Sequence, residues 1–516
     1  MRETAFGLWA AMQSAEFAST ADKVAIVFDT RASSRGFADV VAQALGSRGS
    51  EVVLVDEPRP TPQLSYLVRQ HGCGAGIVIS ASHNPPTDNG IKVYGPDGAQ
   101  VLGARDRVLM EAIVAGDVGV GDATPRITTL GPAQADPAYI EYVLSQGVTS
   151  TALGESGLVV TFSPLHGVGH SSVLPVLRAR GLAPLVVESQ LPDEGRFATV
   201  ASANPEAPAA FERSIALADA HAADLSLATD PDADRLGAVA RNGAGKLEFI
   251  DGNRIGVLML DHVLRSLAAV DDPSLREGWV LTTLVTSTLI AKLGRARGVE
   301  VVDDLLVGFK NHAGAQAEGD PRSLIFACEE SHGYLRGNQI RDKDGAIAAL
   351  LMCELAAECK RAGQTLFDRL AEIWHEHGYH RERTGNLYAE GSAGRRAIAA
   401  VMQALRDRPP SAFAGLDVVA RRDRSEPGTT GSPTRDLTGN VLIYELAGEG
   451  RGARLVFRPS GTEPKIKVYV LAHGRPGLSG SVAADEQREV DALIDRVLKE
   501  AESMADAVMR PLLERA

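Results

Sequence analysis

Residues 75–86, AGIVISASHNPP, begin with an apolar run and end in a small polar loop closed by two prolines. The apolar run predicts a buried strand, and the loop holds the hydroxyl of Ser82 at the carboxyl edge of a sheet. Open α/β sheets bind their ligands at that edge. A serine hydroxyl is a weak nucleophile until neighbouring groups or a metal activate it. The segment therefore predicts an α/β fold with a candidate nucleophile.

Three more strand-like runs lead into polar loops: DPDADR at 230–235, EESHG at 329–333 and RPSGTEPK at 458–465. The first loop has aspartates at every second position, a spacing that suits a metal ion. The second has a hydrogen-bond acceptor and a donor at alternate positions. The third has small and hydroxylated residues between an arginine and a lysine. A serine hydroxyl, a loop suited to a metal ion, a loop suited to sugar hydroxyls and a loop suited to a phosphate together indicate phosphoryl transfer on a sugar.

The order of elements predicts several domains. Strand-like and helix-like runs alternate, and this β-α-β order restarts twice, which favours mainly parallel sheets covered by helices. The last part of the chain has antiparallel strand signals instead. We expect three related α/β domains with mixed, mainly parallel sheets and a smaller C-terminal α+β domain, around a central cleft. The expected boundaries are 1–147, 148–268, 269–385 and 386–516.

Composition limits the function classes. At 516 residues the chain is too long for one core, and its net charge of −13 argues against nucleic acid or an anionic membrane as partner. Four scattered cysteines do not make a disulfide framework or a zinc site. The N-terminus lacks a secretory signal and no run is long enough to span a membrane. We expect a cytoplasmic protein; its oligomeric state is open.

Asp230, Asp232 and Asp234 alternate along an extended loop, so their carboxylates can converge on one hard cation. A calcium EF-hand is excluded, because Arg235 and Arg241 stand where that loop needs Gly and Glu. The alternative is a solvated acidic turn. Three carboxylates leave room for substrate oxygens, which suits Mg²⁺.

The other loops are less specific on their own. The Ser82 loop is not the nucleophile elbow of hydrolases, since it lacks the flanking glycines, and Ser82 could simply form a turn. The 458–465 segment bares backbone N–H groups between Arg458 and Lys465, which suits a phosphate, but a hairpin turn is the alternative. Arg31 ends the first strand and could reach the same cleft, although a lone arginine there is more often structural. Glu329 and Ser331 could hold two adjacent sugar hydroxyls.

Taken in order, these loops resemble the α-D-phosphohexomutase superfamily, over roughly residues 23–469. SPLHGVG, ATDPDADRLG, GFK, EESHGY, RDKDG and RPSGTEPKIK are most similar to its phosphoglucomutase-2 and phosphopentomutase branch. The resemblance implies four domains around a cleft, Mg²⁺, sugar phosphate substrates and a sugar 1,6-bisphosphate primer. It also implies a mutase that moves phosphate between the 1 and 6 positions of a hexose, with glucose as the expected sugar.

The resemblance assigns a role to each matching residue. Ser82 matches the phosphorylated serine and, with Asp230, Asp232 and Asp234, the metal ligands. His83, Lys92 and Lys343 match the basic residues from which the general acid/base is drawn. The residues that match substrate contacts are Arg31, Arg235, Gly308, Lys310, Glu329, Ser331, Arg458, Ser460, Gly461, Thr462 and Lys465.

Several alternatives stay open. Phosphomannomutase, phosphopentomutase and sugar-bisphosphate synthase share this chemistry. The family's usual FGT-x-GLRG segment is absent ahead of the first helix, so a truncated, catalytically weak sugar-phosphate-binding protein is the alternative from another class. A metal-dependent phosphatase is a third, which would release phosphate without isomerisation.

Overall fold

The computed structural model describes residues 1–116, 119, 121–316, 320–427, 438–461 and 463–514. The chain divides into two compact units. The first comprises Met1–Leu281, Arg297–Glu300 and Gly308–Arg369, and the second comprises Thr282–Ala296, Val301–Val307 and Leu370–Ala516. No helix among the described residues is long and apolar enough to cross a membrane.

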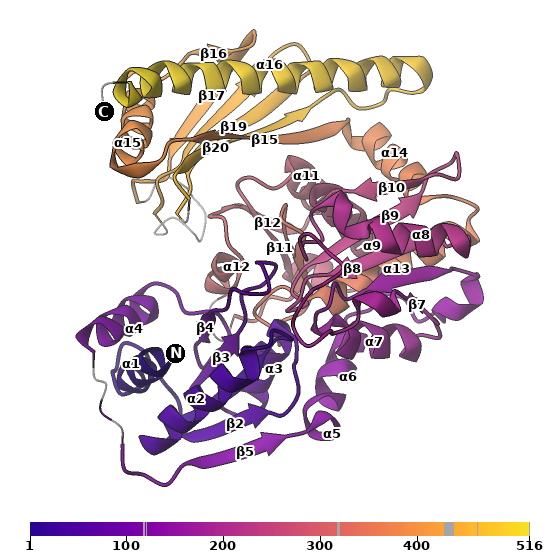
Figure 1. The fold of residues 1–516 in the computed structure, drawn as a ribbon. Coiled ribbons are helices and arrows are strands. Elements are labelled where there is room, and N and C mark those ends of the chain that lie inside the picture. The colour runs from indigo at the N-terminus through magenta and orange to yellow at the C-terminus, as the bar shows by residue number, and fades with distance from the viewer. Residues whose placement is uncertain (117–118, 120, 317–319, 428–437, 462, 515–516) are drawn as a thin grey trace. The chain divides into compact units, whose positions relative to one another are not determined.

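The first sheet has the order β4-β3-β1-β2-β5 (Figure 1). Its strands are β1 (Lys23–Phe28), β2 (Glu51–Val55), β3 (Ala75–Ile79), β4 (Ile91–Tyr94) and β5 (Arg126–Leu130). Its helices are α1 (Arg2–Met12), α2 (Ser34–Ser47), α3 (Thr61–Gln70), α4 (Ala104–Ala115), α5 (Pro132–Ala135) and α6 (Pro137–Ser145). All neighbouring strands are parallel except β3 and β4, which are antiparallel.

The alternation of side chains along β1 explains why helices cover both faces of this sheet. Val24, Ile26 and Phe28 pack with α1, α2 and α4 in one core cluster. Ala25 and Val27 point to the opposite face and pack with α3 in a second cluster. A strand buried on both faces has to be apolar at nearly every position, and β1 is.

The second sheet has the order β10-β9-β8-β6-β7. Its strands are β6 (Val160–Ser163), β7 (Leu185–Val186), β8 (Leu225–Thr229), β9 (Leu236–Arg241) and β10 (Leu247–Ile250). The helices are α7 (Val173–Ala179), α8 (Glu212–Ala220) and α9 (Gly252–Ala269), with short 3₁₀ turns at Leu153–Ser156, Val168–Ser171, Glu188–Gln190 and Pro208–Phe211. Strands β6, β7 and β8 run parallel, whereas β9 and β10 are antiparallel additions.

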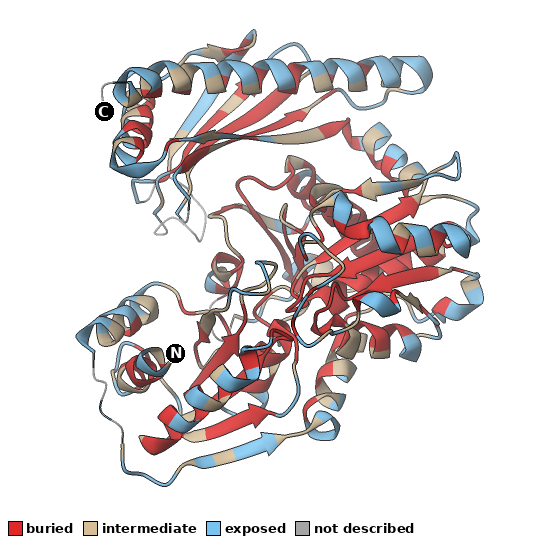
Figure 2. Cartoon of the chain, viewed as in Figure 1, coloured by how far each residue is buried: buried red, intermediate tan, exposed pale blue. Residues whose placement is uncertain are grey.

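The third sheet has the order β12-β11-β13-β14. Its strands are β11 (Trp279–Thr283), β12 (Glu300–Leu305), β13 (Leu324–Glu329) and β14 (Gly333–Leu335). The helices are α10 (Ser274–Glu277), α11 (Thr288–Ala296), α12 (Lys310–Ala315), α13 (Gly345–Arg361) and α14 (Leu366–His377). Helix α13 is buried along most of its length (Figure 2). The carboxylate of Asp344 caps it by accepting the N–H groups of Ala346 and Ile347.

The C-terminal part of the second unit is a six-stranded antiparallel sheet of order β15-β20-β19-β18-β17-β16. The strands are β15 (His380–Tyr388), β16 (Ala412–Phe413), β17 (Leu416–Asp423), β18 (Leu442–Ala447), β19 (Gly452–Pro459) and β20 (Lys465–His473). Helices α15 (Gly391–Asp407) and α16 (Gly480–Leu513) pack on one face of it (Figure 1).

One feature of the sheets differs from the sequence-based expectation. Each of the four polar loops joins two neighbouring antiparallel strands. The Ser82 loop was expected at the carboxyl edge of a parallel sheet, whereas a hairpin turn was already the alternative for residues 458–465. The strand pairs next to the loops are Ile79 with Ile91, Thr229 with Leu236, Glu329 with Gly333 and Pro459 with Ile466. Strand pairing therefore fixes both ends of every candidate functional loop.

The C-terminal sheet offers a test of this packing. Phe413 is fully buried in the cluster under α15 and α16, and its ring lies edge-on to Tyr444. We expect Phe413→Ala to lower the free energy of unfolding of this unit by about 3–5 kcal/mol, because it leaves a cavity. Urea unfolding followed by circular dichroism measures the change. Val482→Ala, at an exposed position on α16, is the control and should change it by no more than about 0.5 kcal/mol.

Candidate active site

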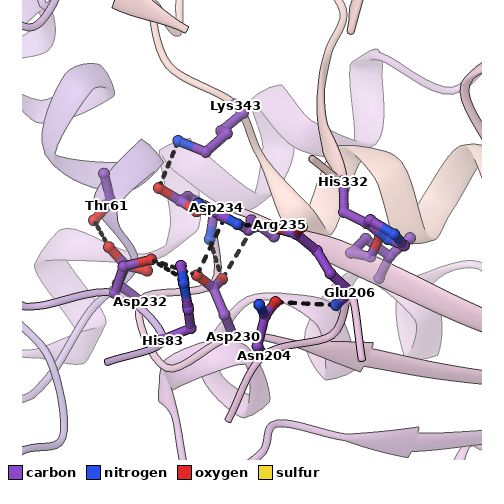
Figure 3. Close-up of polar contacts among 12 residues, drawn as sticks. Thr61, His83, Asn204, Glu206, Asp230, Asp232, Asp234, Arg235, His332 and Lys343 are labelled. Atoms are coloured by element: carbon purple, nitrogen blue, oxygen red, sulfur yellow. Dashed lines mark hydrogen bonds and ion pairs between the residues drawn. The ribbon is translucent and has the colours of Figure 1, made fainter. Parts of the chain in front are cut away.

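The acidic loop between β8 and β9 brings three buried carboxylates together. Ligand oxygens of Asp230, Asp232 and Asp234 lie within 4.8 Å of one another (Figure 3). The loop folds this way because Oδ1 of Asp230 accepts the backbone N–H groups of Asp234 and Arg235 at 3.1 and 3.0 Å. Ala233 adopts a positive φ of 53° to make the turn. The solvated-turn alternative is thus inconsistent with the structure, since all three carboxylates are almost inaccessible to water.

Cations from other elements compensate this buried negative charge. Lys92 of β4 places its Nζ 2.8 Å from Asp232 Oδ2, and Lys343 places its Nζ 2.8 Å from Asp234 Oδ2. Arg235 adds longer contacts to Asp230 and Asp234. Burial alone would lower the pKa of each lysine, but the carboxylates raise it above the ordinary value.

The three carboxyl groups are not equivalent. Burial and the charges of Asp234 and Asp232 raise the pKa of Asp230 well above its ordinary value. Burial also disfavours ionisation of Asp232, but the adjacent Lys92 outweighs it, and the pKa of Asp232 lies below its ordinary value. Ionisation of Asp230 is therefore disfavoured, and a bound cation would favour it.

The donor set fits a hard metal ion. Oδ1 of Asp232 and Oδ1 of Asp234 are buried and have no hydrogen-bond partner within the described ranges. Buried carboxylate oxygens without partners are costly unless a ligand satisfies them. Oxygen ligands at close spacing are what Mg²⁺ and Ca²⁺ bind.

Ser82 lies beside this cluster. Its Oγ donates to Asp230 Oδ2 at 2.8 Å and lies 3.3 Å from Nδ1 of His83. Its backbone has a positive φ of 51°, a conformation that costs a non-glycine residue about 1–3 kcal/mol and is concentrated at functional sites. Burial and the charge of Arg235 lower the pKa of His83. The structure therefore brings the predicted nucleophile, the predicted metal ligands and three predicted basic residues into one place.

Arg31, predicted either to contact the substrate or to have a structural role, holds the Ser82 loop. Its side chain is buried, and the guanidinium donates to the Asp29 carboxylate and to backbone carbonyls of the Ser82 loop. Every N–H group is committed in this way. Arg31 therefore has no N–H group left to donate to a substrate, and its contacts favour a structural role in holding the loop.

Glu329, the last residue of β13, is in contact with one other residue that the sequence predicts to bind the sugar. The backbone N–H of Gly308 donates to Glu329 Oε1 at 2.8 Å, and Gly308 has a φ of 112° that favours glycine. Burial raises the pKa of Glu329 to about 7. The side chains of Ser331 and Lys310 make no hydrogen bond to another described residue, so both remain available for a ligand.

The candidate phosphate loop connects β19 to β20 in the second unit. Ser460 donates its N–H to the Lys465 carbonyl at 2.9 Å, and Lys465 pairs with Glu463 at 2.7 Å. The side chain of Arg458 makes no ion pair or hydrogen bond with any other residue that the structure describes. Adding a Cβ at Gly461 would meet nothing within 4 Å. Thr462, also predicted to bind phosphate, lies outside the described residues.

The sequence reading missed three residues of the site. Thr61, at the start of α3, donates its hydroxyl to Asp232 Oδ2 at 2.9 Å, and its N–H to the Asp232 carbonyl. Glu206 forms a close ion pair with Arg235. Asp342 accepts the hydroxyl of Tyr94 at 2.6 Å. Asp342 directly precedes Lys343 and could have been recognised; Thr61 and Glu206 have no signal except their turn-like settings.

The acidic loop also depends on a close backbone approach. A Cβ at Gly167 would lie 2.2 Å from Pro231 Cα, so only glycine fits there. We expect Gly167→Ala to displace the loop and weaken the binding of a divalent cation by at least about tenfold, equivalent to about 1.4 kcal/mol. Isothermal titration with MgCl₂ measures this affinity. Gly243→Ala is the matched control, because nothing lies within 4 Å of its added Cβ; equal weakening in both variants would contradict the prediction.

Comparison with known proteins identifies the family. Models of the three alpha/beta/alpha domains of phosphoglucomutase/phosphomannomutase match residues 3–117, 137–243 and 251–377. The phosphoglucomutase of Staphylococcus aureus (strain USA300) is 34% identical over 462 residues, which are 87% of this chain and 81% of that protein.

Solved structures show the same fold. A putative phosphomannomutase from Thermus thermophilus has a TM-score of 0.69 at 21% identity, and the match covers 98% of this chain and 95% of that one. Parafusin, a phosphoglucomutase from Paramecium, has a TM-score of 0.70 at 16% identity, covering 99% and 92%. They confirm the predicted class of three α/β domains with a C-terminal antiparallel sheet domain. The chain belongs to the phosphoglucomutase/phosphomannomutase family.

Proposed function

We propose that this protein is a phosphoglucomutase, which interconverts glucose 1-phosphate and glucose 6-phosphate through a phosphoserine and a sugar bisphosphate. The observation that carries the proposal is the position of Ser82 Oγ, 2.8 Å from Asp230 in a cluster of three buried carboxylates. The 34% identity to a curated phosphoglucomutase supports the reaction and the sugar. Family membership favours an enzyme over a sugar-phosphate-binding protein.

In the proposed cycle, phosphorylated Ser82 gives its phosphoryl group to a free hydroxyl of the bound sugar monophosphate. The bond between Ser82 Oγ and phosphorus breaks, the sugar oxygen forms the new bond, and the sugar hydroxyl loses its proton to a base. The bisphosphate then turns around, and Ser82 Oγ loses its proton and bonds to the other phosphorus. The bond between that phosphorus and the sugar oxygen breaks, and the sugar oxygen takes up a proton to become a hydroxyl. Such a transfer depends chiefly on positioning and on charge stabilisation.

The residues around Ser82 suit these steps. Asp230, Asp232, Asp234 and the Ser82 oxygen would hold Mg²⁺, which when bound neutralises charge on the transferring phosphoryl group. Lys92 and Lys343 would add positive charge from two further elements. The proton donor and acceptor are drawn from His83, Lys92 and Lys343.

The remaining roles concern the sugar and its second phosphate. Glu329 and Ser331 would bind sugar hydroxyls, with Gly308 and Lys310 alongside and Arg235 at a phosphate or hydroxyl. Arg458, Ser460, Gly461, Thr462 and Lys465 would bind the phosphate that does not react. The guanidinium of Arg458, which pairs with no other described residue, supports this, because an arginine can bind phosphate through two parallel hydrogen bonds.

The finer predictions remain proposals. They comprise the phosphoglucomutase-2 and phosphopentomutase branch, the domain boundaries 1–147, 148–268, 269–385 and 386–516, and a cytoplasmic location. Phosphomannomutase is the second candidate function, since the matching family includes it. Turnover on glucose, mannose and pentose 1-phosphates, primed with glucose 1,6-bisphosphate, distinguishes these activities.

The first test concerns the nucleophile. We expect Ser82→Ala to abolish the mutase activity, and to remove the fraction of protein that carries one phosphate in intact-mass spectra. Loss of one hydroxyl in a half-buried loop should leave the fold intact. Ser145→Ala, at an exposed serine, is the control. A Ser82 variant with more than about a tenth of the wild-type rate would contradict the assignment, because that loss is only ~1.4 kcal/mol of barrier.

The second test concerns the distal phosphate. We expect Arg458→Ala to raise KM and to lower kcat, because binding energy from the non-reacting phosphate also positions the reacting one. Arg458→Lys should restore only part of the activity, since lysine cannot form two parallel hydrogen bonds. Inorganic phosphate should compete with substrate in the wild type and much less in Arg458→Ala. Equal inhibition of wild type and Arg458→Ala by inorganic phosphate would place the distal site elsewhere. The same conclusion would follow if the control Arg408→Ala, at an exposed arginine, lost as much activity as Arg458→Ala.

A further inference from the structure

We infer that Arg31 is a positioning residue for the nucleophile: its guanidinium clamps the backbone of the Ser82 loop and makes no contact of its own with substrate. This inference rests on the phosphoserine mechanism proposed above. It replaces the substrate contact that the sequence predicted for Arg31 with a different role in the same reaction.

The clamp reaches along most of the loop. Nη2 donates to the carbonyls of Ser82 and Asn84 at 2.7 and 2.8 Å. Nη1 donates to the carbonyls of Pro85 and Asp88. One planar cation thus gathers four carbonyl groups of the loop, including that of the nucleophile itself. The loop lacks regular secondary structure, so it has few backbone hydrogen bonds of its own to hold these carbonyls in place.

The guanidinium is itself held rigidly. Its Nε donates to Asp29 Oδ2 at 3.0 Å, and the other oxygen of Asp29 accepts the backbone N–H of Arg31 and the hydroxyl of Ser34. Both side chains of the Asp29–Arg31 pair are fully buried. The ring of Phe197, from the region of the second sheet, lies 5.2 Å from the guanidinium.

The backbone of residues 195–197, which belong to the region of the second sheet, also packs against Arg31 and Ala32. A Cβ at Gly195 would lie 2.2 Å from the Ala32 nitrogen, so the 195–197 segment packs directly on residues 31–32. The acidic loop belongs to the same region of the chain. Arg31 therefore fixes the Ser82 loop against the part of the molecule that carries Asp230, to which Ser82 Oγ donates.

The role explains the strained backbone of Ser82. A positive φ at a serine persists only where the surroundings over-determine it. The bonds to the carbonyls on either side of residue 83 restrain the loop in that conformation. Removing them should let Ser82 relax to a commoner backbone geometry and turn its Oγ away from Asp230.

Arg31→Lys tests this role with the charge retained, because one ammonium cannot reach four carbonyls in a plane. We expect kcat to fall at least about tenfold while KM for glucose 1-phosphate stays within about twofold, since the substrate-binding groups are untouched. Arg31→Ala should lose more, and millimolar guanidinium should restore part of its kcat. Arg105→Lys and Arg105→Ala are the matched controls: Arg105 also binds a backbone carbonyl and an aspartate in this domain, but its partners lie outside the Ser82 loop.

A second measurement is independent of the mutase reaction. Hydrogen–deuterium exchange of a peptide covering residues 80–90 should be at least about tenfold faster in Arg31→Lys than in wild type, and unchanged in Arg105→Lys. If the wild type lacks mutase activity but this exchange pattern appears, the proposed function fails and the clamp stands. A rise in KM with unchanged kcat in Arg31→Lys would indicate that Arg31 contacts the substrate directly and would contradict the positioning role. Unchanged exchange in residues 80–90 would contradict the clamp.

Discussion

The site depends on one electrostatic constraint: three carboxylates lie buried in a single short loop, where their mutual repulsion is strong. Such a cluster is stable only if cations surround it, and the chain supplies them from separate elements. Lys92 comes from β4 in the first sheet, and Lys343 from the segment before α13. Arg235 follows the cluster directly and is itself paired with Glu206. The acidic loop therefore links elements that are far apart in sequence, and in the proposed reaction the same charges would act on a phosphate.

Much of this arrangement could be predicted from the sequence. The bounds of β1, β2 and β11 could be predicted from the sequence, because a strand buried on both faces is apolar at most positions. The acidic loop was recognisable because three aspartates at alternate positions after an apolar run favour a bound cation. β4 and β15 were missed, since one is four residues long and contains a lysine and the other reads HRERTGNLY, mostly polar. A polar strand at a sheet edge has no periodicity strong enough to detect.

Residues that act together within one loop can be found from the sequence, whereas residues that meet only in the folded chain cannot. Spacing identifies residues that act together within one loop, such as Asp230 and Asp234. It does not identify partners that meet only in the folded chain, and so Thr61 and Glu206 were missed. For Arg31 the sequence left two readings open, a ligand contact and a structural role, and the structure shows that its five donors are used inside the protein. Whether an arginine binds a ligand or a loop depends on its unused donors, which only a three-dimensional structure reveals.

The antiparallel strand pairs beside the four loops have a consequence for how such enzymes diversify. When the two strands that flank a loop pair with each other, the loop can change without changes in the rest of the sheet. The loop between Glu329 and Gly333 has only three residues, whereas the one between Ile79 and Ile91 has eleven and needs the bonds from Arg31 to hold it. In the proposed reaction, exchange of the hairpin tip that carries Ser331 would change the contacts to the sugar while the strand pairing stays as it is.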